Sequence, residues 1–212
     1  MKPAFLFQSL VGAALAMAAS ATFAIDDPIN DFIPGYTGAR SGDLDVVSSF
    51  VTYTPGTDTF FFSGTMNAAI GTTPSAFYVW GLDRGTGTAR FGAIATGVLF
   101  DAVVILRLDG SATVGLLPGN TVLPGAATFA GNTISASISG TLLPGNGFAK
   151  SAYTWNLWPR DGAVAAGNAQ ISDFAPDNSN AAVAVVPEPA SVALLALGLG
   201  AIGWRARRRS AT

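Results

Sequence analysis

The chain has 212 residues, of which 50% are hydrophobic, and it contains neither cysteine nor histidine. This composition excludes disulfides, thiol nucleophiles, serine nucleophiles activated by histidine and the usual zinc sites, and with them most hydrolase mechanisms. All twelve aspartates and six basic residues lie between residues 25 and 185, so this region carries a net charge of −6 and is expected to repel nucleic acid.

The first 24 residues have the composition of a secretory signal peptide. A basic second residue precedes an almost wholly apolar or small stretch over residues 4–19. Small residues that suit signal cleavage follow at Ala21 and Ala24. We therefore assign 1–24 to a signal peptide. The alternative is an N-terminal membrane-spanning helix, for which the stretch is short.

Residues 25–175 show the periodicity of β-strands. Apolar residues alternate with their neighbours in three segments, at 77–81, 133–139 and 153–158. Glycine- and proline-rich turns separate the segments, and Gly131-Asn132 is the clearest two-residue hairpin turn. The pattern predicts an all-β domain, a single antiparallel β-sandwich of about eight to ten strands with a jelly-roll-like topology.

Four segments depart from this alternation. Residues 59–62 and 102–106 are mainly apolar without alternation, which is typical of strands that are covered on both faces or lie deep between two sheets. Residues 26–42 are expected to form an irregular lead-in. Residues 176–185 are expected to form a linker.

The chemistry open to this domain is that of carboxylates. No local spacing singles out an acid–base pair among the candidates Asp83, Asp101, Asp109, Asp161, Asp173 and Asp177. Most of them have the positions of turn residues, so we expect no enzymatic activity. The alternative is an aspartate-dependent glycan-degrading enzyme. Asp101, which precedes an apolar strand, is expected to be buried and to pair with Arg107 or Arg160.

The least generic part of the domain is the aromatic segment that ends at Arg160, together with residues 171–179. An exposed face with a ring for stacking and carboxylates for hydroxyl groups is a candidate sugar site, formed by Trp158, Arg160, Asp173 and Asp177. The hard oxygen ligands that calcium prefers occur in the same segment, at Asp173, Asp177 and Asn178. The alternative is that the aspartates cap turns.

The strand, Leu142-Leu143-Pro144 turn and aromatic strand in this part resemble the final third of DOMON and family-9-like carbohydrate-binding sandwiches. That resemblance implies sugar binding.

Residues 186–209 combine three features. The first is a short motif in which prolines flank the only glutamate of the chain: Val186, Pro187, Glu188 and Pro189. The second is an uncharged run over residues 190–204, a predicted hydrophobic helix that is shorter than the ~20 residues that span a bilayer comfortably. The third is a basic tail, expected to stay cytoplasmic, with Arg205, Arg207, Arg208 and Arg209.

This arrangement resembles the PEP-CTERM sorting signal of Gram-negative bacteria. The resemblance implies recognition by a membrane-embedded exosortase, which removes the tail after transient anchoring in the inner membrane. The alternative is an ordinary tail anchor. We predict an exported surface or extracellular-matrix protein with a structural, adhesive or glycan-binding role, with exopolysaccharide as a candidate partner and no cofactor other than the candidate calcium.

Overall fold

The computed structural model describes residues 23–186 and 197–199. The predicted signal peptide falls almost wholly outside these residues, as do Ala21, most of the sorting motif and the basic tail. Ala24 is exposed and directly precedes the first strand. The elements between residues 25 and 185 are strands and short 3-10 helices.

Two sheets make up most of the fold. Sheet A contains, in spatial order, β1 (Ile25–Asp26), β2 (Val46–Thr54), β3 (Thr59–Met66), β11 (Thr133–Ser139) and β10 (Ala127–Ala130), with β14 (Ala184–Val185) also paired to β2. Sheet B contains β13 (Ala181–Ala182), β12 (Thr154–Asp161), β4 (Ala76–Asp83), β7 (Ala102–Arg107), β8 (Ala112–Gly115) and β9 (Asn120–Leu123). A separate pair is formed by β5 (Thr88–Ala89) and β6 (Leu99–Phe100).

Short 3-10 helices occur between the strands. They are η1 (Gly42–Leu44), η2 (Pro55–Thr57), η3 (Gly92–Ile94), η4 (Gly140–Leu142), η5 (Lys150–Ala152) and η6 (Asn168–Gln170).

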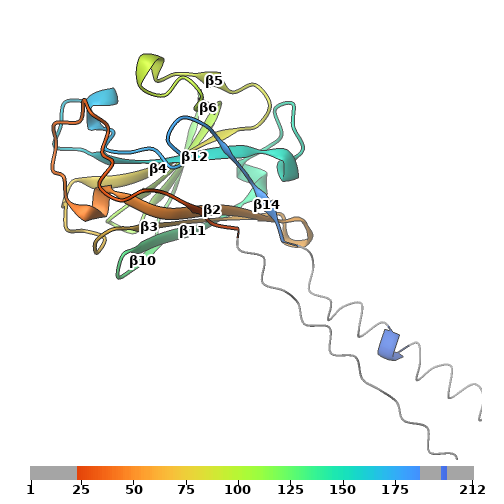
Figure 1. Cartoon of the computed structure of the whole chain (residues 1–212). Coiled ribbons are helices and arrows are strands. Elements are labelled where there is room, and N and C mark those ends of the chain that lie inside the picture. Colours follow the sequence, from red (N-terminus) through yellow and green to blue (C-terminus); the bar gives the residue numbers. More distant parts are fainter. Residues whose placement is uncertain (1–22, 187–196, 200–212) are drawn as a thin grey trace, which may run out of the picture.

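The sheets lie face to face as the two layers of a sandwich (Figure 1). Hairpins connect many neighbouring strands, and three pairs, β3 with β11, β4 with β12 and β14 with β2, join distant parts of the chain. All pairs are antiparallel except β14 with β2. The described residues contain nine strands of four or more residues, so the predicted antiparallel sandwich is confirmed.

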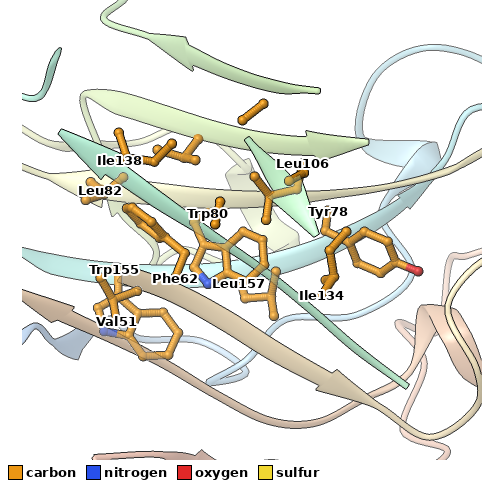
Figure 2. Packing of buried hydrophobic residues seen from close by; sticks show 14 of the residues in the cluster. Val51, Phe62, Tyr78, Trp80, Leu82, Leu106, Ile134, Ile138, Trp155 and Leu157 are labelled. Carbon is orange, nitrogen blue, oxygen red and sulfur yellow. The ribbon is translucent and has the colours of Figure 1, made fainter. Parts of the chain in front are cut away.

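The core lies between the sheets and follows the predicted alternation. On β4 the side chains of Tyr78, Trp80 and Leu82 point inward, and Leu157 on β12 does the same (Figure 2). The Trp80 ring meets the Phe62 ring edge-on at 6.0 Å between centroids. Because both sheets supply large apolar side chains, this interface buries much of the apolar surface that stabilises the fold.

The predicted hairpin at Gly131-Asn132 is confirmed. β10 pairs with β11 so that Ala130 lies opposite Thr133, which leaves two residues in the turn. Gly131 has a φ of 58°, a left-handed conformation that glycine adopts without a steric penalty.

The structure decides between the two alternatives for the apolar runs. They lie between the sheets, where Phe60 and Val104 are buried in the core, and they are not covered on both faces, because Phe61 and Ile105 on the outward faces are half-exposed. The expected linker needs correction, because it is partly strand: β13 pairs with β12, and β14 pairs with β2. The sandwich therefore extends to Val185, because the main chain after residue 175 completes an edge of each sheet.

A second apolar cluster lies on the outer face of sheet B. Residues 84–101, here called the cover segment, leave the sheet after β4, form β5, η3 and β6, and return to β7. In Figure 1, β5 and β6 lie on the side of β4 and β12 that faces away from sheet A. Phe91 and Phe100 of the cover segment pack on Trp158 of β12, with ring centroids 4.9 and 5.1 Å away.

Candidate functional site

The sorting motif begins where the sandwich ends. Val186 is the first residue of the motif, and its backbone N–H donates a hydrogen bond to the Tyr53 carbonyl at 2.9 Å. The two residues before it form β14, which pairs with the edge of β2. The folded domain therefore holds the chain as far as the motif, without an intervening linker. Pro187, Glu188 and Pro189 lie outside the described residues.

Three aspartates from distant parts of the chain converge beside β2. One carboxylate oxygen each from Asp27, Asp31 and Asp173 lies within 4.8 Å of the other two. The N-terminal segment is held against the segment after β12 because Ile33 N donates to Ser172 O at 2.9 Å. The lead-in is thus irregular, as predicted, but it is fixed to the sandwich.

These carboxyl groups have raised pKa values. Burial raises the pKa of Asp173 to about 7, although its oxygens accept hydrogen bonds from Val46 N and Phe174 N at 2.9 and 2.7 Å. Burial and the charges of its neighbours, Asp173 first, raise the pKa of Asp27 to about 8. The buried oxygens Asp27 Oδ2 and Asp31 Oδ1 accept no hydrogen bond. The cluster therefore favours shared protons near neutral pH.

The predicted calcium ligands are only partly brought together. The carboxylates grouped with Asp173 are those of Asp27 and Asp31, and Asp177 is outside that group. Asn178 Oδ1 accepts a hydrogen bond from Gly97 N at 2.8 Å. The sequence did not indicate that Asp27 and Asp31 belong to this cluster, because their approach to Asp173 depends on how the lead-in folds back. Calcium binding stays a prediction.

The predicted exposed sugar face is not formed. Trp158 is only 2% exposed, because its ring lies over Gly81 under the two phenylalanines of the cover segment. Asp173 is 1% exposed. Trp155 and Trp158 do lie on opposite faces of β12, but each face is covered, so the expectation that Trp158 is a surface aromatic is wrong.

Trp158 and Arg160 instead share a cavity of about 200 Å³ on the outer face of sheet B. It is lined by Phe77 and Val79 from β4, Val103 and Ile105 from β7, and Trp158 and Arg160 from β12, with two rings of the cover segment on one side. A second cavity, of about 140 Å³, lies between the lead-in and η6. No aspartate lines either of these two cavities.

Asp101 is buried as predicted, but its partner is Arg84. Arg84 Nε lies 2.9 Å from Asp101 Oδ1, and Thr86 Oγ1 and Asn146 Nδ2 donate to Asp101 Oδ2 at 3.0 and 2.9 Å. Burial acts to raise the pKa of Asp101, but these hydrogen bonds outweigh it and the pKa is lowered. The expected pairing with Arg107 or Arg160 is therefore wrong. The contacts with Arg84 join the two ends of the cover segment.

Three other candidate acids stabilise turns or loops, as the turn interpretation predicted. Asp83 Oδ1 accepts from Gly85 N and Gly87 N, each at 2.8 Å. Asp109 Oδ1 accepts from Ser111 N at 2.8 Å. Asp161 accepts hydrogen bonds from Ser75, Ala163 and Ala39.

Fold and junction together define a β-sandwich whose last strand leads directly into the segment that resembles a sorting signal. Residues 185–209 match the PEP-CTERM protein-sorting motif, which covers the Pro-Glu-Pro residues, the hydrophobic run and the basic tail. The chain is therefore an exported protein that transits the membrane and is processed by exosortase, a membrane enzyme. Comparisons with curated proteins and with solved structures give no match. Among residues 23–186 and 197–199, no helix has the length and apolarity needed to span a membrane.

Proposed function

We propose that this chain is a non-enzymatic structural or adhesive protein of the cell surface or extracellular matrix, whose copies associate through one edge of the sandwich. The observation that supports the proposal is the composition of the edge formed by β9 and β10. β9 is the last strand of sheet B and β10 the last strand of sheet A, and three residues connect them. Exopolysaccharide as the surrounding matrix belongs to the same proposal.

This edge is uncharged and exposes two large apolar side chains. Residues 110–149 contain no aspartate, glutamate, lysine or arginine. Within them Val122 on β9 is 61% exposed and Phe129 on β10 is 46% exposed. Edge strands of soluble proteins usually carry charges or other features that block pairing with a second sheet, and these two strands carry no charge.

A second copy of the chain is the partner that fits this edge. Two copies with a domain charge of −6 repel each other over most of their surfaces. Contact through β9 and β10 buries no charge, and the strands offer backbone groups for β-sheet extension. Repulsion elsewhere then restricts association to this edge, as a regular structural assembly requires.

The alternative functions have less support. Glycan binding was predicted from an exposed tryptophan that stacks on a sugar, but Trp158 is buried. An aspartate-dependent glycan-degrading enzyme needs carboxyl groups that a sugar can reach, whereas Asp173 is buried with both oxygens bonded to backbone amides. We expect that the chain releases no reducing sugar from host exopolysaccharide. Release by the wild type that is lost in Asp173→Asn would support the alternative of a glycan-degrading enzyme.

Co-precipitation of two tagged forms tests the association. Both forms are expressed as full chains in a host that contains exosortase, and wild-type copies should co-precipitate. The double variant Val122→Lys and Phe129→Lys adds like charges to the edge and should abolish this. Phe148→Lys is the matched control, because Phe148 is 43% exposed but lies outside β9 and β10. Equal co-precipitation by the double variant would refute the proposed edge.

Processing is tested separately. Glu188→Ala should leave a full-length, membrane-held chain, whereas Asp177→Ala, which changes an exposed acid before the motif, should be processed normally. Neutral replacements of Arg205, Arg207, Arg208 and Arg209 should alter protease protection in spheroplasts, because the cytoplasmic charge is lost. Normal maturation of Glu188→Ala would contradict the role of the motif without affecting the test of the edge.

A further inference from the structure

The cavity on the outer face of sheet B combines an apolar wall with one cation. Seven of its eight lining residues are aliphatic or aromatic, and the eighth is Arg160. Arg160 Nε is buried and has no hydrogen-bond partner. An unpartnered guanidinium N–H in apolar surroundings is costly, and a bound carboxylate would satisfy it with a charge-assisted hydrogen bond.

Unpaired arginines are concentrated around this cavity. Of the six basic residues in residues 25–185, Arg84 and Lys150 have a carboxylate within 4.0 Å in the described part of the chain. Two of the other four lie over rings of the cavity wall: Arg107 is 5.5 Å from the centroid of Phe77, and Arg90 is 5.6 Å from that of Phe100. Together with Arg160 they form a positive region on an otherwise acidic domain.

Burial also lowers the pKa of Arg160, in keeping with a guanidinium that has lost much of its hydration. A negative ligand group would offset that loss.

The size and polarity of the cavity limit the ligand class. A volume of about 200 Å³ is close to that of cavities that accept a single aromatic ring. A sugar would leave several hydroxyl groups without partners against this wall. A free inorganic anion would not use the apolar surface. The ligand that matches both features has one apolar ring and one carboxylate.

We propose that this cavity binds a small aromatic monocarboxylate, with its ring against Trp158 and Ile105 and its carboxylate on Arg160. Arg107 and Arg90 attract the anion to the opening, and the cover segment provides one wall. The site is independent of the β9–β10 edge. It uses two of the residues singled out from the sequence, but for a different ligand class.

Fluorine NMR of para-fluorobenzoate tests the proposal, with the full chain reconstituted in zwitterionic lipid nanodiscs and empty nanodiscs as reference. The ligand signal should shift and broaden with saturation. para-Fluorobenzamide has the same ring without the charge, and fluoroacetate has the charge without the ring. Both should bind at least about 10-fold more weakly, because each loses one of the two interactions.

Arg160→Met is the decisive variant and should weaken para-fluorobenzoate binding by about 10- to 100-fold. Arg160→Lys keeps the charge without the planar fork and should lie between this variant and wild type. Arg40→Met is the matched control, because Arg40 lies over Phe32 and away from the cavity lining, and it should bind normally.

If Arg160→Met does not fold, Ile105→Trp fills the cavity while keeping Arg160 and should also abolish binding. Equal binding by Arg160→Met and wild type, or equal binding of the amide and the acid, would overturn the proposal. Unchanged binding in Ile105→Trp would place the ligand elsewhere and would also overturn it.

Discussion

The two faces of sheet B are built from the same strands but are covered in different ways. The inner face packs on a second sheet, so Tyr78, Trp80 and Trp155 are enclosed by regular strands from both layers. The outer face is covered by residues 84–101 and 171–174, and the remaining surface forms the cavity beside Arg160. One face therefore depends on sheet packing and the other on an added segment.

Different interactions hold the two covers in place. The inner interface is stabilised by apolar area over many strands. The cover segment has a smaller apolar contact, through Phe91 and Phe100 on Trp158, and its ends are joined by the buried Arg84–Asp101 pair. A small aromatic contact and a few polar bonds are easier to remove than a whole apolar layer. The comparison indicates that the outer cover is the part that a substitution can detach without unfolding the sandwich, which suits a binding site more than a core does.

The largest effect is expected from truncation on the inner face. Trp155 is 1% exposed in the main core, and Trp155→Ala should lower the free energy of unfolding by about 3–5 kcal/mol. Equilibrium urea unfolding of residues 23–186 would measure the loss. Val122→Ala on the exposed edge is the control and should change little. A loss below about 1 kcal/mol for Trp155→Ala would show that the inner face is not the main core.

The second largest effect is expected from breaking the Arg84–Asp101 pair, which joins the two ends of the cover segment. Asp101→Ala leaves the Arg84 guanidinium buried without its partner and should cost about 3 kcal/mol. Hydrogen exchange should rise mainly in residues 84–101. Asp58→Ala breaks the more exposed pair with Lys150 and should cost much less. Uniformly faster exchange over both sheets would contradict a separable cover.

Trp158→Ala gives the direct comparison with the inner face. Its ring is buried but borders the cavity, so fewer contacts are lost, and the expected cost is about 2–3 kcal/mol. The same urea experiment applies. A cost equal to or above that of Trp155→Ala would mean that the two faces contribute alike, and a negligible cost would mean that the ring is free of its cover.

The sequence predicted the inner face well for a physical reason. Two-residue alternation marks a strand and fixes which of its side chains share a face, so the segments at 77–81, 133–139 and 153–158 were predicted as strands without knowledge of the strand order. The sorting signal was equally accessible, because its three features are contiguous in the chain.

The outer face was not predicted, because its cover has no periodic pattern. Trp158 shares a strand face with polar residues, which indicates an exposed position. Only the fold shows that residues 84–101 return over it. The acid cluster was not predicted for a similar reason, since Asp27 and Asp173 are far apart in sequence. Arg84 was missed as the partner of Asp101 because its glycine-rich surroundings indicate a turn and give no direction for its side chain.

The smallest expected effect concerns the acid cluster where the outer cover meets the lead-in. Asp27 and Asp173 have raised pKa values, so the folded state holds protons that the unfolded chain has released. Their contribution to stability is complete below pH 4 and is lost as the pH rises through about 7 to 8. Carboxyl groups with lowered pKa values, such as that of Asp101, are ionised in both the folded and the unfolded state above pH 5. They therefore do not change the pH dependence of stability in that range.

Stability should therefore fall between pH 5 and pH 8, by on the order of 1–2 kcal/mol after allowance for the solvent that reaches Asp27. Urea midpoints measured with a chelator present would show the decrease, and Asp173→Asn should flatten it. Added calcium that restores the midpoint at pH 8 would support the predicted cation. A midpoint that rises from pH 5 to pH 8 under chelation would mean that these carboxyl groups are ionised in the fold, and the raised pKa values would then be wrong.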